Sequence, residues 1–164
     1  MSITPKLICD MIQDAMVLDD DQIWIYNQRR AIPQDKRLYV VVGLISAKPY
    51  GNNSRFNSTT MSTEVTLYMQ ELISIDLFSY TMAAQERFHE ALGAFQTTYG
   101  QQQCELNALR IAAIPMHVTD TSAIEGPTLL NRISISLQVL RKYDIVKAST
   151  YFDDYSDLDI NYEQ

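Results

Sequence analysis

The feature that most constrains this fold is a long alternation of apolar and polar residues over positions 64–78. At about 3.3 Å per residue, an unbroken strand of this length reaches about 50 Å, whereas a domain of this size has a radius of gyration of about 15 Å. The pattern therefore predicts a strand that projects as a hairpin arm, or one that bends at a bulge near Glu71. Either arrangement exposes sheet edges to another subunit. The apolar phase contains Val65, Leu67, Met69, Ile73, Ile75 and Leu77.

A second alternation, over residues 133–139, predicts a strand with one dry and one wet face. An apolar run over residues 109–118 predicts its partner strand, and a polar corner over residues 119–127 joins the two. Pro115 and the phase shift at Ala112 and Ala113 favour an edge position or a bulge in the first of these strands.

Further elements follow from local patterns. Thr4 is expected to cap a helix with Pro5 at its first position. Residues 22–27 predict a short strand that is apolar on both faces, and residues 38–45 a strand rich in β-branched residues. A main helix is expected after residues 79–81 and up to Gly100, followed by a polar segment over residues 101–104.

The stretch over residues 46–62 is predicted to be irregular, because it combines Pro49 and Gly51 with several Asn and Ser residues. Irregular segments of this length are usually functional or disordered. Two interpretations stay open, a floppy insertion and a docking loop that orders on assembly. In the second case Tyr50 and Arg55 are candidate interface residues.

The order of these elements predicts an α+β fold: an antiparallel (mixed) sheet with long hairpin strands and helices packed on one face. Residues 1–150 are expected to form a single domain. Residues 151–164 form an acidic tail with five acids, no Lys or Arg, and interleaved aromatic residues. The tail is either solvated and mobile or docks on a neighbouring subunit through Tyr151, Phe152 and Tyr155.

Charge and composition exclude several classes of function. The formal net charge is -7, and the sequence has no basic stripe with which to neutralise phosphates, so we expect no specific grip on DNA. Cys9 and Cys104 have neither a metal-ligand spacing nor a disulfide framework, and both are expected to be reduced. No signal-like start and no apolar run of about 18 residues is present, so we expect a soluble protein made in the cytoplasm, without a membrane partner.

The sequence lacks the usual motifs for nucleotide binding and nucleophilic catalysis. His89 and His117 have no partner at metal-binding spacing and are interpreted as structural. We therefore predict a protein that is not an enzyme, with no catalytic, cofactor-binding or metal-binding residues. Glu71 is unusual because its phase places it among apolar residues. It is either turned outward by a bulge, paired in an inter-subunit salt bridge, or a general acid or base in a cavity.

Glu125 lies in the polar corner and Arg132 shortly after it, and both are further interface candidates. Arg132 begins the alternating strand, from which its guanidinium reaches either Glu125 or an acid on an adjacent protomer. The first arrangement is an internal clamp on the loop. The second is a contact between two different surface patches, as cyclic symmetry above a dimer requires.

The same region resembles a known family, the neck or tail terminator proteins of long-tailed bacteriophages. The residues that carry the resemblance are Ser122-Ala123-Ile124-Glu125-Gly126, Leu130-Asn131-Arg132, the alternating strand that follows, and Tyr151-Phe152-Asp153.

The resemblance implies a structural virion protein that forms a homo-hexameric ring. Such a ring caps the tail tube, ends its assembly and joins the tail to the neck and head. The implied partners are the tail tube protein, the tail sheath if the tail is contractile, and a head-completion or neck protein. DNA passes through the lumen without specific binding, and the implied location is the virion, after assembly in the host cytoplasm.

Two alternatives stay open. One is a head-completion or connector subunit at the portal. The other, from a different class, is a small α+β ligand-binding protein or enzyme whose sheet forms a pocket.

Overall fold

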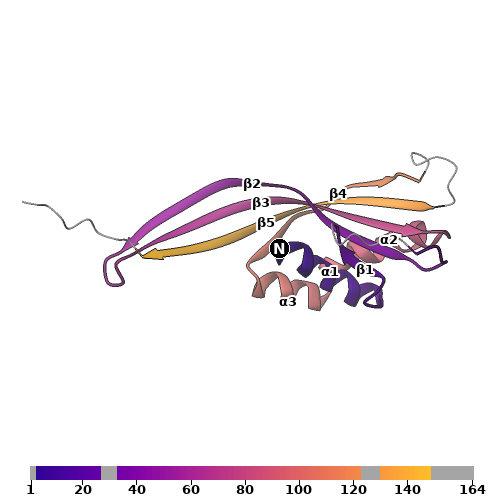
Figure 1. Ribbon diagram of the computed structural model, residues 1–164, viewed down its shortest axis with the longest axis horizontal. Helices are drawn as coiled ribbons and strands as arrows, with labels where there is room; N and C mark the ends of the chain where they lie inside the picture. Colours follow the sequence, from indigo (N-terminus) through magenta and orange to yellow (C-terminus); the bar gives the residue numbers. More distant parts are fainter. Residues whose placement is uncertain (1–2, 27–32, 123–129, 149–164) are drawn as a thin grey trace, which may run out of the picture.

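The computed structural model describes residues 3–26, 33–122 and 130–148. These residues form three α-helices, one 3₁₀ helix and five strands (Figure 1). In chain order they are α1 (Ile3–Met16), β1 (Ile23–Ile25), β2 (Tyr39–Asn57), β3 (Ser62–Ser79), α2 (Ala83–Gly93), η1 (Ala94–Gln96), α3 (Thr98–Leu106), β4 (Leu109–Asp120) and β5 (Asn131–Ala148).

The five strands make one sheet in the order β1-β2-β3-β5-β4. All neighbours pair antiparallel except β1 and β2, which pair parallel. The three α-helices lie on the same side of the sheet, at one end of the molecule (Figure 1). The predicted α+β fold, with a mixed sheet and helices on one face, is confirmed.

The main core lies between the helices and the inner half of the sheet. Ile133, Ile135, Leu137 and Val139 are all nearly or fully buried, as the period-2 pattern of this strand predicted. Burying one such side chain contributes about 1.5–3 kcal/mol. The facing helices and the neighbouring strands supply Ile8, Met11, Ile12, Val40, Val42, Ile73, Ile75, Leu77, Ala84, Ala91 and Phe95.

A smaller apolar cluster lies on the opposite face of the sheet. It joins Trp24 from β1 to Tyr39, Val41 and Phe78, and Leu130 packs against it. The rings of Trp24 and Tyr39 are 5.7 Å apart. Ile23 belongs to the main core, so β1, predicted to be apolar on both faces, is buried on both.

The prediction of an irregular stretch over residues 46–62 is wrong. Strand β2 continues through it to Asn57, and only residues 58–61 form the hairpin turn to β3. Pairing with the strongly alternating β3 overrides the local turn propensity. Register shifts between Leu44 and Ser46 and between Pro49 and Gly51 absorb the residues that fit a regular strand least well.

Two details of the predicted helices are also wrong. Helix α1 begins at Ile3, so Thr4 lies inside it, and its buried hydroxyl accepts a hydrogen bond from Arg141 instead of capping the helix. The expected main helix is broken after η1. There Thr97 caps a separate helix, α3, by accepting a hydrogen bond from the Gly100 N–H at 3.0 Å.

Strand β4 lies at an edge of the sheet, as Pro115 predicted. Its register with β5 shifts between Ile111 and Ala113 and again between Ala113 and His117, close to the predicted phase change. None of the helices in the described ranges combines the length and apolar character needed to cross a membrane.

The turn after α1 carries local strain at Val17. The Leu18 N–H donates to the carbonyl of Gln13 at 3.1 Å, a helix-ending turn that usually has glycine where Val17 stands. Val17 has a φ of 51°, which costs an L-residue about 1–2 kcal/mol.

We therefore expect Val17→Gly to raise the free energy of unfolding by about 1 kcal/mol, measured by urea denaturation. Val17→Ala is the control, because it keeps the Cβ and so most of the strain. A Val17→Gly protein no more stable than Val17→Ala contradicts this account.

Candidate interaction surface

The outer halves of three strands project from the helix-covered body as an arm (Figure 1). We define the arm as residues 46–57 of β2, 62–72 of β3 and 138–148 of β5, which are continuously paired. The predicted hairpin arm is thus confirmed, and β5 adds a third strand to it. At about 3.3 Å per residue, the 18 residues of β3 span about 60 Å. The buried core stops at Val42, Ile73 and Val139, at the root of the arm.

One face of the arm continues the inner face of the core, and we call it the underside. The alternation of side chains along β3 and the register with its neighbours place these residues together. Phe56 is 44% exposed and Ile145 49% exposed, while Val65, Leu67 and Met69 are half-buried. The underside is therefore an apolar sheet face that none of the described helices covers.

The opposite face of the arm is polar, as the alternation predicted. Thr66 donates to Asp144 at 2.7 Å, and Lys142 forms an ion pair with Asp144 at 2.9 Å. Tyr50 and Tyr68 stack loosely on this face, with ring centroids 6.0 Å apart. These contacts fix the strands relative to each other while leaving the polar groups at the surface.

The outer edge of β2 in the arm carries features that discourage strand pairing. Within the described ranges, β1 pairs with β2 only from Val40 to Val42, so no described strand pairs with the outer edge of β2 beyond Val42. That edge contains Lys48, Pro49 and two register shifts, which are common means of preventing edge-to-edge association. The arm thus protects this edge more than its underside.

A buried polar cluster lies at the root of the arm. Glu71 is 3% exposed, and its Oε1 accepts a hydrogen bond from the Tyr143 hydroxyl at 2.7 Å. Arg141 lies over the Tyr143 ring at 4.9 Å and donates to the Thr4 hydroxyl at 2.9 Å. Burial, followed by the hydrogen bond to Glu71, raises the pKa of Tyr143. The Glu71 Oε2 and Arg141 Nε atoms are buried and have no hydrogen-bond partner among the described residues.

The expectation that a bulge turns Glu71 outward is wrong. The irregularity lies in β2, between Leu44 and Ser46, whereas β3 stays regular and pairs Glu71 with both Ala47 and Val139. The carboxylate therefore keeps the phase of the apolar residues. Its partners were not predicted, although the alternation of β5 places Arg141 and Tyr143 on the same face as Val139.

Arg132 makes an internal contact. Its guanidinium lies 3.4 Å from the Asp76 carboxylate and 5.1 Å from the centre of the Phe78 ring. The Ser134 hydroxyl also donates to Asp76. The backbone N–H of Arg132 donates to the Ser122 hydroxyl at 2.8 Å, which ties the ends of β4 and β5 together. Arg132 therefore clamps the sheet through Asp76. Glu125, the partner expected from the sequence, lies outside the described residues, as do Tyr151, Phe152 and Tyr155.

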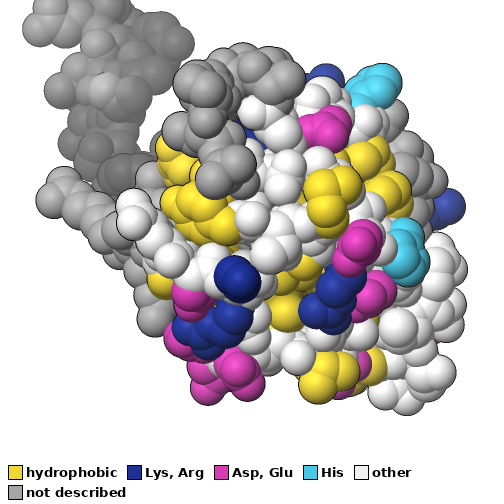
Figure 2. Space-filling model, turned by 90° about the vertical axis from the view of Figure 1, so that its right-hand side faces the viewer, with side chains coloured by type: hydrophobic (Ala, Val, Ile, Leu, Met, Phe, Trp, Pro, Cys, Tyr) yellow, Lys and Arg dark blue, Asp and Glu magenta, His cyan; other side chains and the backbone are white. Residues whose placement is uncertain are grey.

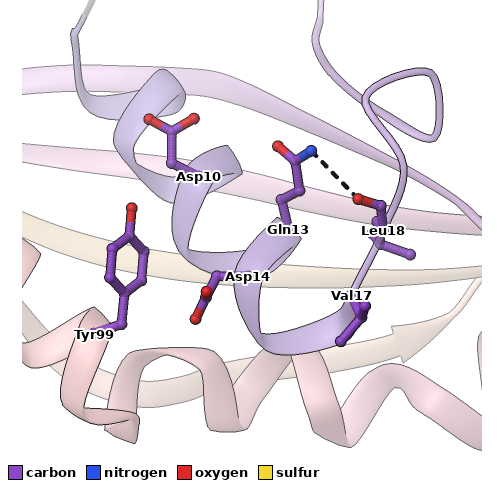
Figure 3. A pocket seen from close by; sticks show the side chains of 6 residues that line it. All are labelled: Asp10, Gln13, Asp14, Val17, Leu18 and Tyr99. Atoms are coloured by element: carbon purple, nitrogen blue, oxygen red, sulfur yellow. Dashed lines mark hydrogen bonds between the residues drawn. The ribbon is translucent and has the colours of Figure 1, made fainter.

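A hollow of about 530 Å³ lies between the end of α1 and the start of α3 (Figure 3). Asp10 and Asp14, one helical turn apart on α1, line it together with Tyr99 from α3. The Gln13 amide donates to the Leu18 carbonyl at 3.3 Å, and the strained Val17, 88% exposed, also lines the hollow. The hollow offers carboxylates, a phenol and apolar surface, but no cation from its lining residues.

The remaining candidates for chemistry are two histidines and two cysteines. His89 and His117 are both exposed and lie on α2 and β4. Burial raises the pKa of the Cys9 thiol to about 12, with a further contribution from Asp10, and burial also raises the pKa of Cys104. An activated thiol needs a lowered pKa, so neither cysteine is a prepared nucleophile. The described residues contain no group of three or more side chains suited to hold a metal ion.

The end of the body opposite the arm has a mixed surface. Acidic and basic side chains lie next to one another there, with hydrophobic side chains between them (Figure 2). In the described part of the chain, Arg37 pairs with Asp21 and Asp35 at 3.0 Å, and Arg87 pairs with Glu90. Such local neutralisation leaves no continuous basic patch in this view.

Comparisons with known proteins find likeness in structure but none in sequence. No family model and no curated protein matches the sequence. Among solved structures, the chain is similar to the sheath/tube terminator of an extracellular contractile injection system, PVC, determined by cryo-EM in its extended state. The identity is 12% and the TM-score 0.44, with 96% of this chain covered. This chain spans 65% of the length of that chain.

Proposed function

We propose that this chain is a structural subunit of a phage-type tail, forming a homo-hexameric ring that caps the tail tube and joins it to the neck. The observation that carries the proposal is the arm, whose apolar underside is covered by none of the described helices and whose opposite face is polar. Monomeric proteins rarely expose large contiguous apolar surface, so such a face marks an interaction site. The sequence resemblance at residues 122–126 and 130–132 is the reason for proposing that this assembly is a tail terminator ring.

The proposed mechanism is steric. One surface of the ring matches the last ring of the tube, and the other offers no template for a further ring, so polymerisation stops. The polar face of the sheet, which carries Gln70, Ser74, Ser136 and Gln138 at half-buried positions, is proposed to line the lumen. A net charge of -7 suits a passage that must let a DNA duplex slide, because like charges repel the phosphates.

The test removes this protein from the assembling particle and examines the products by electron microscopy. Tails of uncontrolled length, or tails that never join heads, are expected, and supplying the full chain should restore finished particles. Finished particles without the protein contradict the proposal. As a control, Lys36→Gln, a substitution at an exposed position of the body, should support assembly.

A further inference from the structure

We propose that the underside of the arm seats the helix layer of a second copy of this chain, in a head-to-tail contact. The inference deepens the proposed function and rests on its homo-oligomeric ring. The contact places Val17 and the hollow at the end of α1 of one copy against the apolar underside of the next copy's arm.

The underside is the continuation of a surface that helices already cover. In the body, residues Ile73 and Ile135 on this face are fully buried beneath the chain's own helices. Beyond Glu71 the same face of the same strands carries Leu67, Met69 and Ile145 without any described helix over it. A helix layer is therefore the kind of partner whose packing this face is built to accept.

The arm cannot use the chain's own helices for this purpose. The helices lie beneath the body, and the arm extends away from them (Figure 1). The edge of β2, with Lys48 and Pro49, is also poorly suited to pairing with a strand from another protein. A second copy brings the same helices to the underside from outside, so that face is covered without using the edges.

Val17 supplies an independent observation. It is 88% exposed and holds a φ of 51° in a position where glycine costs less. Backbone strain of this kind is typical of functional positions. This apolar, β-branched side chain at the rim of a hollow is left largely unpacked by the described residues, and it matches the apolar surface formed by Val65, Leu67 and Ile145.

The charges of the two surfaces are complementary. Lys147 is the exposed charge on the described underside, near the tip of the arm. The hollow carries the carboxylates of Asp10 and Asp14. None of these three side chains forms an ion pair within the described residues. A contact between the two surfaces brings opposite charges together, which favours a single orientation of docking.

The contact is heterologous, because the arm of one copy meets the helix layer of another. In such a pair, one copy still has a free helix layer and the other a free arm, and each can bind a further neighbour. Repetition of a heterologous contact gives a closed ring when the rotation closes, and a filament when it does not. The same interaction therefore accounts for ring formation in the proposed function.

The experiment measures self-association of the full chain by sedimentation velocity and light scattering. Lys147→Glu and Asp14→Lys, both at exposed positions, should each weaken association at least tenfold. An equimolar mixture of the two variants should associate again, because each supplies the charge that the other has lost. Lys36→Glu, an exposed charge reversal on the body, is the matched control and should change little.

Val17→Gly gives a second readout. It should weaken self-association while raising the free energy of unfolding, and a folding defect cannot produce that combination. A further variant neutralises the acidic tail by changing Asp153, Asp154, Asp157 and Asp159 to Asn. If this variant no longer self-associates, the acidic tail and not the helix layer is the segment that binds the underside, and the proposal is overturned. A wild-type chain that stays monomeric at every concentration, or equal effects of Lys147→Glu and Lys36→Glu, also overturns it.

The two proposals fail in different ways. If the chain assembles by another surface, Lys147→Glu leaves association intact, and the tail-capping role is unaffected. If particles finish normally without the protein, the tail-capping role is lost, whereas the head-to-tail contact is still measurable in solution.

Discussion

Gly100→Ala is expected to lower the free energy of unfolding by about 3 kcal/mol or more. Gly100 is buried in the first turn of α3, and a Cβ there would collide with the carbonyl oxygen of Ala94 and lie 3.2 Å from the Cα of Phe95. Both obstacles are backbone atoms, so no side-chain rotation relieves the clash. The Thr97 hydroxyl, which donates to the Ala94 carbonyl at 2.8 Å, fixes the same turn.

Gly93→Ala is the matched control, because nothing lies within 4 Å of the Cβ it would add. Gly93 is the last residue of α2 and has helical backbone geometry, so alanine at this position should stabilise the protein by about 0.5–1 kcal/mol. Urea denaturation of both variants measures the difference. Equal stabilities for the two variants would show that the close turn between η1 and α3 has been described wrongly.

Tyr143→Phe is expected to lower the free energy of unfolding by about 1–3 kcal/mol. The substitution removes the hydroxyl that donates to Glu71 Oε1, and the Oε2 atom of the same carboxylate already lacks a partner in the described structure. A buried carboxylate would then be left without a hydrogen bond. The cost should be smaller in a Glu71→Gln background, where the side chain is neutral.

Tyr68→Phe is the control for Tyr143→Phe. Tyr68 lies on the polar face of the same arm, and no hydrogen bond of its hydroxyl occurs among the described residues. It should change stability by no more than about 0.5 kcal/mol. Chemical denaturation measures the free energy of unfolding of Tyr143→Phe, of Tyr68→Phe, and of Glu71→Gln with and without Tyr143→Phe. The comparison separates the effect of losing the hydrogen bond from the effect of losing a phenol hydroxyl at the surface. Similar effects of the two Tyr→Phe changes contradict the assignment.

The sheet was predictable because alternation is a strong signal. Residues 64–78 and 133–139 each keep one apolar phase, and both proved to be central strands with that phase buried in the body. The arm followed from length alone, since a strand of this extent cannot fit within a compact domain. Pro115 likewise predicted the edge position of β4.

The errors came from places where pairing or tertiary contacts outweigh local propensity. Residues 46–57 contain Pro49 and Gly51 and look like a loop, yet the partner strand β3 holds them in the sheet. The hydroxyl of Thr4 has cap-like chemistry but bonds to Arg141, a residue 137 positions away. Three environments were left open for Glu71, and none of them was a hydrogen bond from Tyr143, because no local pattern shows that this residue supplies a buried donor.

The candidate surface was predicted in outline only. Tyr50 and Arg55 were expected in an irregular loop, whereas both lie on β2 within the arm, and their role in an interface stays a prediction. Arg132 proved to be an internal clamp. The hollow beside Asp10 and Asp14 depends on the break between η1 and α3, which brings Tyr99 towards α1. That break depends on a single capping threonine, a weak signal in a sequence with many Thr residues.

The arm and the buried sheet are made of the same three strands, and no hinge separates them. A force applied at the hairpin tip therefore travels along β2 and β3 directly into the layer that packs against α1 and α2. Because these antiparallel strands run lengthwise along the lever, pulling on the tip loads many backbone hydrogen bonds in shear at once. Whatever grips the end of this protein thereby acts mechanically on its centre.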